Sequence, residues 1–202
     1  MASALLDLAP LAPPLVYVID GQDRIQAVND AYVADVGGAG GDAQHVRQRL
    51  IGQVIWHVLP GVAEWYGPLV RRARAEQRTV CFPFRCDTPD LRRLMRMRIR
   101  PEPGGAISFE SAVVRVQPRP HVPLVTATGD PGVPVVSMCS WCKRVDAAGD
   151  WLEVEDAMER LGADSNRLPS VSHGICPRCL DELAALAHSP DATLSIGLPA
   201  IT

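Results

Sequence analysis

The sequence predicts an α+β protein in two parts: an antiparallel sheet with helices on one face, followed by a small module that carries cysteines. Strand-like segments gather at both ends of residues 12–117, and helix-like segments lie between them. Strands and helices that are segregated in this way are typical of the α+β class. A stretch rich in proline and glycine follows at 118–134 and is interpreted as a linker. Two Cys-x-x-Cys pairs then occur within residues 135–188.

The first part opens with a predicted β-hairpin. Residues 14–20 (PLVYVID) contain β-branched and aromatic residues, which favour a strand. Gly21–Asp23 is typical of a turn, and RIQAVN supplies the second arm. Asn29 then offers an N-cap for a short helix, AYVADVGG, that ends at glycine.

The middle of the first part is predicted to be helical. VRQRLIGQVIWHVLPGV divides into short helical pieces that end at Pro60, and a longer helix within residues 64–78 is predicted to begin near Gly67–Pro68. The glycine-rich run at 37–42 (GGAGGD) lacks the Gly-Lys-Ser/Thr end of a phosphate-binding loop. We therefore interpret that run as a loop between helices.

Three segments with an alternating pattern close the predicted sheet: TVCFPFRC, LMRMRIR and AISFESAVVRV. Alternation places Val80, Phe82, Phe84, Cys86, Met95, Met97 and Ile99 on the core face. Cys81 and Arg85 fall on the opposite face. The row Arg92, Arg93, Arg96, Arg98 and Arg100 is interpreted as a solvated strand face that discourages edge pairing. Glu110 on the next strand is placed to pair with part of this row.

The cysteine pairs are Cys139/Cys142 and Cys176/Cys179. A Cys-x-x-Cys turn aims two thiolates at one ion, so two such pairs complete a tetrahedral zinc site. The 33 residues between the pairs exceed the roughly 15–20 of a zinc ribbon. A small subdomain is therefore expected between them.

That subdomain is predicted to contain a hairpin and a helix. KRVDAAGDWLEV is typical of a hairpin with Ala-Gly-Asp at its turn, and VEDAMERLG of a helix that ends at Gly162. A second helix opens at Pro177, where a missing N–H is tolerated. A knuckle, a hairpin and a helix that carries the last two ligands make a treble-clef-like zinc subdomain.

Alternatives to a four-cysteine zinc site remain open. His173 could replace one sulfur, or donate a hydrogen bond to a thiolate. An iron–sulfur cluster also takes four thiolates. Disulfides are disfavoured in a reducing cytoplasm, and a thioredoxin-like site would need one pair in a βαβ unit.

The first part resembles the PAS domains of bacterial signalling proteins. The resemblance covers roughly residues 12–117 and is carried by PLVYVIDGQDRIQAVNDAYV, IGQVIWHVLPGV and FRCDTPDLRRLMRMRIRPEPGGAISFESAVVR. It implies a five-stranded antiparallel sheet with helices on one face, and a domain that binds a small molecule or a partner protein. The Asn-Cys-Arg-x-Leu-Gln motif of flavin-adduct photoreceptors is absent.

The cysteine part is similar to a C-terminal module found on bacterial signal-transduction proteins. The similarity covers about residues 138–183 and is carried by MCSWCKRVDAAGDW, VEDAM and SHGICPRCLDEL. It implies a role in bacterial signalling. The stretch GADSNRLPSV before SHGIC is interpreted as an enlarged loop.

Composition limits the possible functions. The chain has 202 residues, 47% of them hydrophobic, which suffices for one full core and a smaller second one. A net charge of −3 supplies no basic field for nucleic acid. The N-terminus is a poor secretory signal, and no stretch is long and apolar enough to span a membrane. We therefore expect a cytoplasmic protein.

No catalytic motif is found, so we expect a non-catalytic signal-transduction sensor or adaptor. Its expected partners are a signalling protein, a small ligand and a second copy of the chain that pairs through ALLDLA at residues 4–9. Nucleic acid and membranes are not expected partners. One alternative is a transcription regulator that binds DNA through Lys143, Arg144, Arg160, Arg167 and Arg178. The other is a redox or gas sensor with an iron–sulfur cluster, or with haem held by His57.

Overall fold

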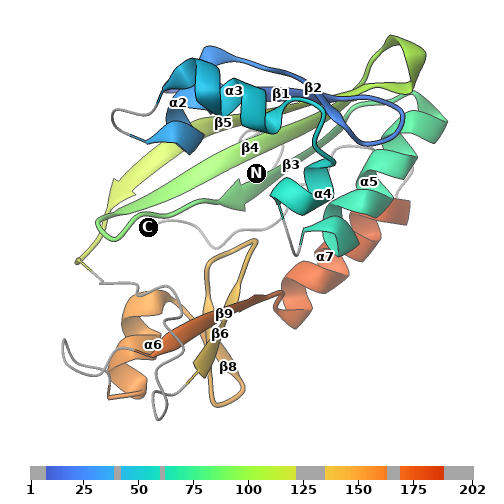
Figure 1. Ribbon diagram of the computed structural model, residues 1–202. Coiled ribbons are helices and arrows are strands. Elements are labelled where there is room, and N and C mark those ends of the chain that lie inside the picture. Colours follow the sequence, from blue (N-terminus) through green and yellow to red (C-terminus); the bar gives the residue numbers. More distant parts are fainter. Residues whose placement is uncertain (1–7, 39–41, 60–61, 122–134, 163–168, 189–202) are drawn as a thin grey trace. The chain divides into compact units, whose positions relative to one another are not determined.

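The computed structural model describes residues 8–38, 42–59, 62–121, 135–162 and 169–188 (Figure 1). The chain divides into two units. Among the described residues, unit 1 comprises those up to Pro83, Met95–Val114 and those from Leu183 to His188, and unit 2 comprises Phe84–Leu94 and Arg115–Glu182. The predicted tail at 189–202, most of the predicted linker and most of the segment ALLDLA lie outside the described residues.

Unit 1 is built on a five-stranded antiparallel sheet, as predicted. Its strands are β1 (Leu15–Ile19), β2 (Ile25–Val28), β3 (Val80–Arg85), β4 (Leu91–Pro101) and β5 (Ile107–Pro118). Their order is β2-β1-β5-β4-β3, so the first strand pairs with the last near the middle of the sheet. A short 3-10 turn, η1 (Pro103–Gly105), connects β4 to β5 where PEPGG predicted a connection.

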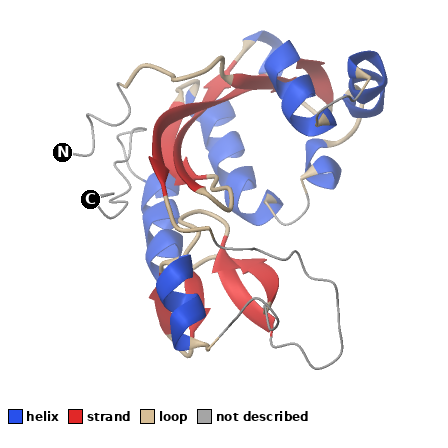
Figure 2. Cartoon of the chain, turned by 90° about the vertical axis from the view of Figure 1, so that its left-hand side faces the viewer, coloured by secondary structure: helices blue, strands red, loops and turns tan. Residues whose placement is uncertain are grey.

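The helices of unit 1 cover one face of this sheet (Figure 2). They are α2 (Asp30–Gly37), α3 (Ala43–Leu50), α4 (Ile55–Val58) and α5 (Ala63–Glu76). The α+β class with a PAS-like sheet is therefore confirmed. Helix α5 begins at Ala63 rather than near Pro68, so Pro68 lies inside the helix and one backbone hydrogen bond is lost there.

Asn29 joins the opening hairpin to the first helix. Its side-chain oxygen accepts a hydrogen bond from the Tyr32 N–H at 2.9 Å, which caps α2 as predicted. The same oxygen accepts from the Val16 N–H at 3.1 Å, and the amide nitrogen donates to the Pro14 carbonyl at 2.8 Å. One polar side chain therefore fixes the angle between β1 and α2.

The core of unit 1 is aromatic at its centre. Tyr17 stacks on Phe109 with ring centroids 4.6 Å apart and contacts Tyr32 at 5.2 Å. Tyr66 meets Phe82 edge-on at 5.8 Å. Aromatic pairs in these geometries add to the stability that burial of the rings supplies.

The predicted faces of the closing strands are partly correct. Val80, Phe82, Met95, Met97 and Ile99 are buried as expected, whereas Phe84 and Cys86 are only half-buried. Arg96, expected on a solvated strand face, and Arg85, expected on the face opposite the core, are both buried. Alternation fails there because both guanidinium groups hydrogen-bond to other segments of the chain.

The remaining arginines of the row differ in exposure. Arg98 and Arg100 are the most exposed. Glu110 pairs with Arg98 at 3.1 Å and with Arg96 at 3.8 Å, as the sequence predicted.

Unit 2 contains a four-stranded sheet, the helix α6 and the first part of α7. The elements are β6 (Val135–Cys139), β7 (Val145–Ala147), β8 (Asp150–Leu152), α6 (Val154–Arg160), β9 (Ser170–Gly174) and the start of α7 (Pro177–His188). The strand order is β8-β7-β6-β9, with β6 and β9 parallel. The hairpin, its Ala148–Gly149 turn with positive φ, and both helices are where the sequence predicted them.

Strands β6 and β9 were not predicted. β9 reads SVSHG, a polar segment whose strand conformation comes from pairing with β6 rather than from its own composition. The hydrophobic core of unit 2 is small and consists of Val136, Met138, Val145, Ala147, Val154 and Ala157. On α7, Leu183 and Leu186 are buried and Leu180 is exposed.

Replacing Phe109 by alanine tests the aromatic core. We expect Phe109→Ala to lower the free energy of unfolding by about 3–5 kcal/mol, because the cavity lies beneath Tyr17. Urea unfolding followed by tryptophan fluorescence measures the change. Val116→Ala, at an exposed position of the same strand, is the control and should change the free energy of unfolding by less than about 0.5 kcal/mol. Equal losses in the two variants would contradict this account of the core.

Candidate metal centre

The structure brings the four predicted cysteines together. The sulfur atoms of Cys139, Cys142, Cys176 and Cys179 all lie within 4.8 Å of one another, and all four residues are buried. The Cys142 and Cys176 sulfurs are 3.8 Å apart. Zn–S bonds of about 2.3 Å in a tetrahedron place sulfurs about 3.8 Å apart. The donors therefore fit a single tetrahedral ion, and the group can hold a metal.

Parallel pairing of β6 with β9 closes the long gap between the two pairs. The register sets Cys139 opposite Gly174, and the Ser140 N–H donates to the Gly174 carbonyl at 2.8 Å. The first pair lies in the turn after β6, and the second follows β9 at the start of α7. Two strands side by side thus deliver both pairs to the same end of the sheet.

The backbone shapes each pair into a turn around its sulfurs. The Cys139 N–H donates to the Arg144 carbonyl at 2.8 Å, and Lys143 takes the left-handed conformation with φ 62°. In the second pair the Cys179 N–H donates to the Cys176 sulfur at 3.4 Å. Such N–H···S contacts stabilise thiolate over thiol.

The cysteine thiols compete for negative charge. The hydrogen bond from Cys142, and then that from Cys179, holds the pKa of Cys139 far below its usual range despite burial. The same bond to Cys139 raises the pKa of Cys142 to about 12. The pKa of Cys179 is raised further by its bonds to Cys139 and Cys142. A divalent cation would relieve this competition, because it stabilises thiolate at every sulfur.

His173 lies outside the group of close donors. It is an exposed residue of β9, where it pairs in register with Met138. Among the described residues, the donors gathered at this point are the four cysteines.

Three of the basic residues on which the DNA-binding alternative rests pair with carboxylates. Arg144 pairs with Glu153 at 3.4 Å, and Arg178 with Glu182 at 3.1 Å. Arg160 pairs with Asp150. Arg167 lies outside the described residues.

His57, the haem ligand of one predicted alternative, lines a cleft in unit 1. His45 and His57 are exposed and border, with Arg49, a cleft of about 650 Å³ between α2, α3 and α4. Its apolar lining comes from residues such as Val46 and Leu50. His57 points to this cleft rather than into the aromatic core.

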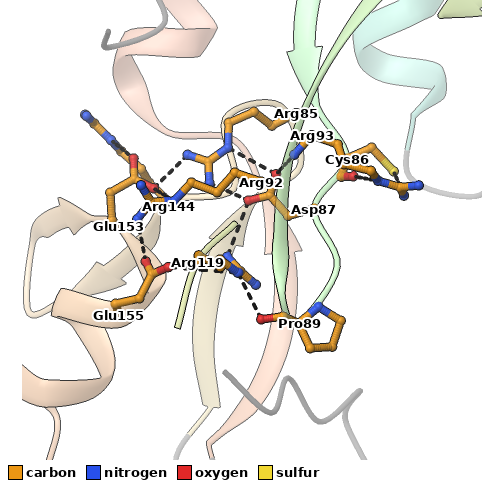
Figure 3. A network of polar contacts seen from close by, with 10 residues as sticks. All are labelled: Arg85, Cys86, Asp87, Pro89, Arg92, Arg93, Arg119, Arg144, Glu153 and Glu155. Atoms are coloured by element: carbon orange, nitrogen blue, oxygen red, sulfur yellow. Dashed lines mark hydrogen bonds and ion pairs between the residues drawn. The ribbon is translucent and has the colours of Figure 1, made fainter. Parts of the chain in front are cut away.

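The sequence did not predict a buried ion-pair network in unit 2 (Figure 3). Its centre is Asp87, in the connection between β3 and β4, with 2% of its side chain exposed. The Asp87 carboxylate accepts hydrogen bonds from Arg85, from the Arg93 N–H at 3.1 Å and from Arg119 at 3.4 Å. Arg119 belongs to the predicted linker, yet its side chain is fully buried.

A second part of the network centres on Glu153, just before α6. Glu153 accepts from Arg85 at 2.7 Å and from Arg144 at 3.4 Å, and Arg92 reaches Glu155 at 3.0 Å. Burial raises the pKa of Glu153, but the charge of Arg85 and its hydrogen bond outweigh burial, so the pKa lies below its usual range. The network therefore joins residues 84–94 to the cysteine segment by charged hydrogen bonds.

One local signal pointed to this network. Arg85 ends a strand whose other side chains alternate regularly, and the acidic stretch LEVED follows the predicted hairpin. A lone arginine at the end of a buried strand and a cluster of acids are complementary. Their separation of 68 positions prevented their pairing from being deduced.

Comparisons with known proteins add little to this picture. No protein-family model matches the chain, and no curated protein matches it. Solved structures do match, among them a sensory box sensor histidine kinase from Vibrio cholerae. The two sequences are 13% identical, and the TM-score is 0.39. The match covers 57% of this chain and 90% of the kinase chain. No helix in the described part of the chain is both long and apolar enough to cross a membrane.

Replacing Glu153 by glutamine tests the network and its pH dependence. The pKa of Glu153 is lower in the folded chain than its unfolded value of about 4.3. Ionised Glu153 therefore adds to the free energy of unfolding above that value, and this addition is lost as the pH falls through the folded pKa. We expect Glu153→Gln to cost about 2–4 kcal/mol near pH 7. The difference from the wild type should shrink below about pH 4.

Urea unfolding over a pH series measures this difference. The groups facing Glu153 are Arg85, Arg92 and Arg144, which stay charged throughout. Glu159→Gln, at an exposed position of α6, is the control and should change stability by less than about 0.5 kcal/mol. A difference that is independent of pH would show that the charge of Glu153 is not involved.

Proposed function

We propose that the chain is a non-catalytic sensor or adaptor of bacterial signal transduction, in which a PAS-like domain binds a small molecule or a partner protein and a structural zinc module serves interaction. The observation that carries the proposal is the closed group of four buried cysteines. Four thiolates fill a tetrahedral ion and leave no open position for substrate. A site of this kind stabilises a fold and performs no chemistry.

The spacing of the sulfurs favours zinc over an iron–sulfur cluster. Every sulfur lies within 4.8 Å of every other, which suits one ion at the centre. A cluster places several irons and sulfides between its thiolates and needs a larger cage. Thiolate sulfur is a soft ligand, and zinc is among the metals that such ligands select. When bound, zinc would supply folding energy to the small core of unit 2.

The sensor half of the proposal is supported by the sheet of unit 1 and by the PAS resemblance of its sequence. Its strands run in the order β2-β1-β5-β4-β3, with helices on one face. The cleft between α2, α3 and α4 is lined by the positively charged Arg49, by His45 and His57, by the acidic Asp42 and by apolar residues such as Val46 and Leu50. We place a small anionic ligand with an apolar part in this cleft. The proposed compartment is the cytoplasm and the proposed assembly a homodimer.

Metal analysis of the purified protein tests the zinc module. We expect about one zinc per chain and a colourless sample prepared without oxygen. Cys176→Ser should lose the metal and unfold unit 2, because a structural site couples binding to folding. Elemental analysis and circular dichroism measure both effects.

The matched control is Cys81→Ser, a cysteine of β3 outside the metal group. It should keep one zinc per chain. A coloured protein with iron in place of zinc would contradict the choice of metal. Unchanged metal content in Cys176→Ser would contradict the four-cysteine site itself.

Native mass spectrometry of the protein as purified tests the ligand cleft. We expect a bound small anion whose occupancy falls at least about tenfold in Arg49→Ala, since loss of a charged hydrogen bond costs about 1.5–3 kcal/mol. His121→Ala is the control, because His121 pairs with Asp90 away from the cleft residues. A protein that carries no ligand would leave partner binding as the role of this domain.

A further inference from the structure

The connection between β3 and β4, residues 84–94, belongs to the same unit as the four cysteines. β3 and β4 are themselves strands of the five-stranded sheet. We propose that metal bound at the four cysteines holds this connection in place, so that metal occupancy is sensed at the ends of two strands of the PAS-like sheet. This inference rests on the proposed metal site.

The first link is a backbone hydrogen bond between the metal turn and β3. The Arg85 N–H donates to the Trp141 carbonyl at 2.8 Å. Trp141 is buried and lies between the ligands Cys139 and Cys142. An ion held by both cysteines fixes the turn that contains this carbonyl. The end of β3 therefore pairs with backbone that the metal holds in shape.

The second link is the charged network. Glu153 is shared by Arg85, at the end of β3, and Arg144, two residues after Cys142. The backbone of Arg144 is fixed in turn by its carbonyl, which accepts from the Cys139 N–H. Loss of the metal would release this turn and with it one partner of Glu153.

Burial makes the two links cooperative. The side chains of Arg85 and Asp87 are 3% and 2% exposed, and that of Arg119 is fully buried. Buried charges that lose a partner are strongly destabilising unless water reaches them. Four arginine side chains face three carboxylates in the network: Arg85, Arg92, Arg119 and Arg144 against Asp87, Glu153 and Glu155. When the Glu153 side of the network moves, residues 84–94 must open to hydrate the remaining charges.

Hydrogen exchange of the full chain with and without metal tests the inference. The metal is removed with a chelator in the presence of a thiol reductant and restored with zinc chloride. We expect the amides of Arg85, Cys86 and Arg93 to exchange on the order of 100-fold faster without metal and to recover with zinc. Amides of β1 and β2, which belong to unit 1, should change little.

Two variants separate the link from the metal site. Arg85→Met should still bind one zinc per chain, but residues 84–94 should exchange rapidly in both states, so the metal-dependent difference falls below about threefold. Arg98→Met removes a more exposed β4 arginine that pairs with Glu110 and should behave as the wild type. If Arg85→Met does not fold, Glu153→Gln removes the charge of the other partner of the same hydrogen bond, and the same loss of the metal-dependent difference is expected.

The outcomes distinguish this inference from the proposed function. A protein that holds no metal overturns both. A protein that binds zinc but shows unchanged exchange of residues 84–94 on its removal overturns the inference and leaves the metal site standing. A metal-dependent difference that persists in Arg85→Met and in Glu153→Gln overturns the role of the charged network in the inference, because the backbone bond from Arg85 to Trp141 remains in both variants.

Discussion

The parallel pairing of β6 with β9 is the interaction on which unit 2 depends. It sets Cys139 opposite Gly174, so that the turn after one strand and the helix after the other meet at one point. Parallel neighbours require a long crossover connection. The hairpin of β7 and β8 and the helix α6 lie within that crossover. The separation of the cysteine pairs is therefore a consequence of sheet topology.

Charge burial imposes the second constraint. Asp87 and Arg119 are as buried as the apolar core, and an isolated charge at that depth would be prohibitively costly. The network resolves this by sharing each carboxylate among several arginines. Such a network contributes little net stability compared with apolar packing, but removal of one member is expensive. Its effect is to allow one arrangement of residues 84–94 and to disfavour loosened ones.

The extent to which the sequence predicted the structure follows from these two constraints. Elements governed by local chemistry were predicted: the Asn29 cap, the turn at Ala148–Gly149 and the helix that opens at Pro177. The four metal-ligand positions were identified by spacing, and the structure gathers them. Strand β9 was missed because its polar residues become a strand only through β6.

Arg85 and Arg96 were misplaced for a related reason. Alternation along a strand predicts which side of the sheet a residue faces, but not whether a distant segment covers that side. Arg85 is covered by the segment around Glu153, and Arg96 hydrogen-bonds to the Leu8 carbonyl at 2.8 Å. Long-range partners of this kind leave no periodic trace in the sequence.

The size of unit 2 explains why metal, sheet and ion pairs occur together. Its hydrophobic core rests on small or medium side chains such as Val145, Ala147 and Ala157, and a core of that size stabilises a fold only weakly. An ion bound at the four cysteines would compensate, because its binding energy is available only to the folded form. The charged residues of 84–94 and Arg119 supply further contacts that the cysteine segment cannot make alone. Residues 84–94 therefore complete unit 2, although in the sequence they lie between two strands of the five-stranded sheet.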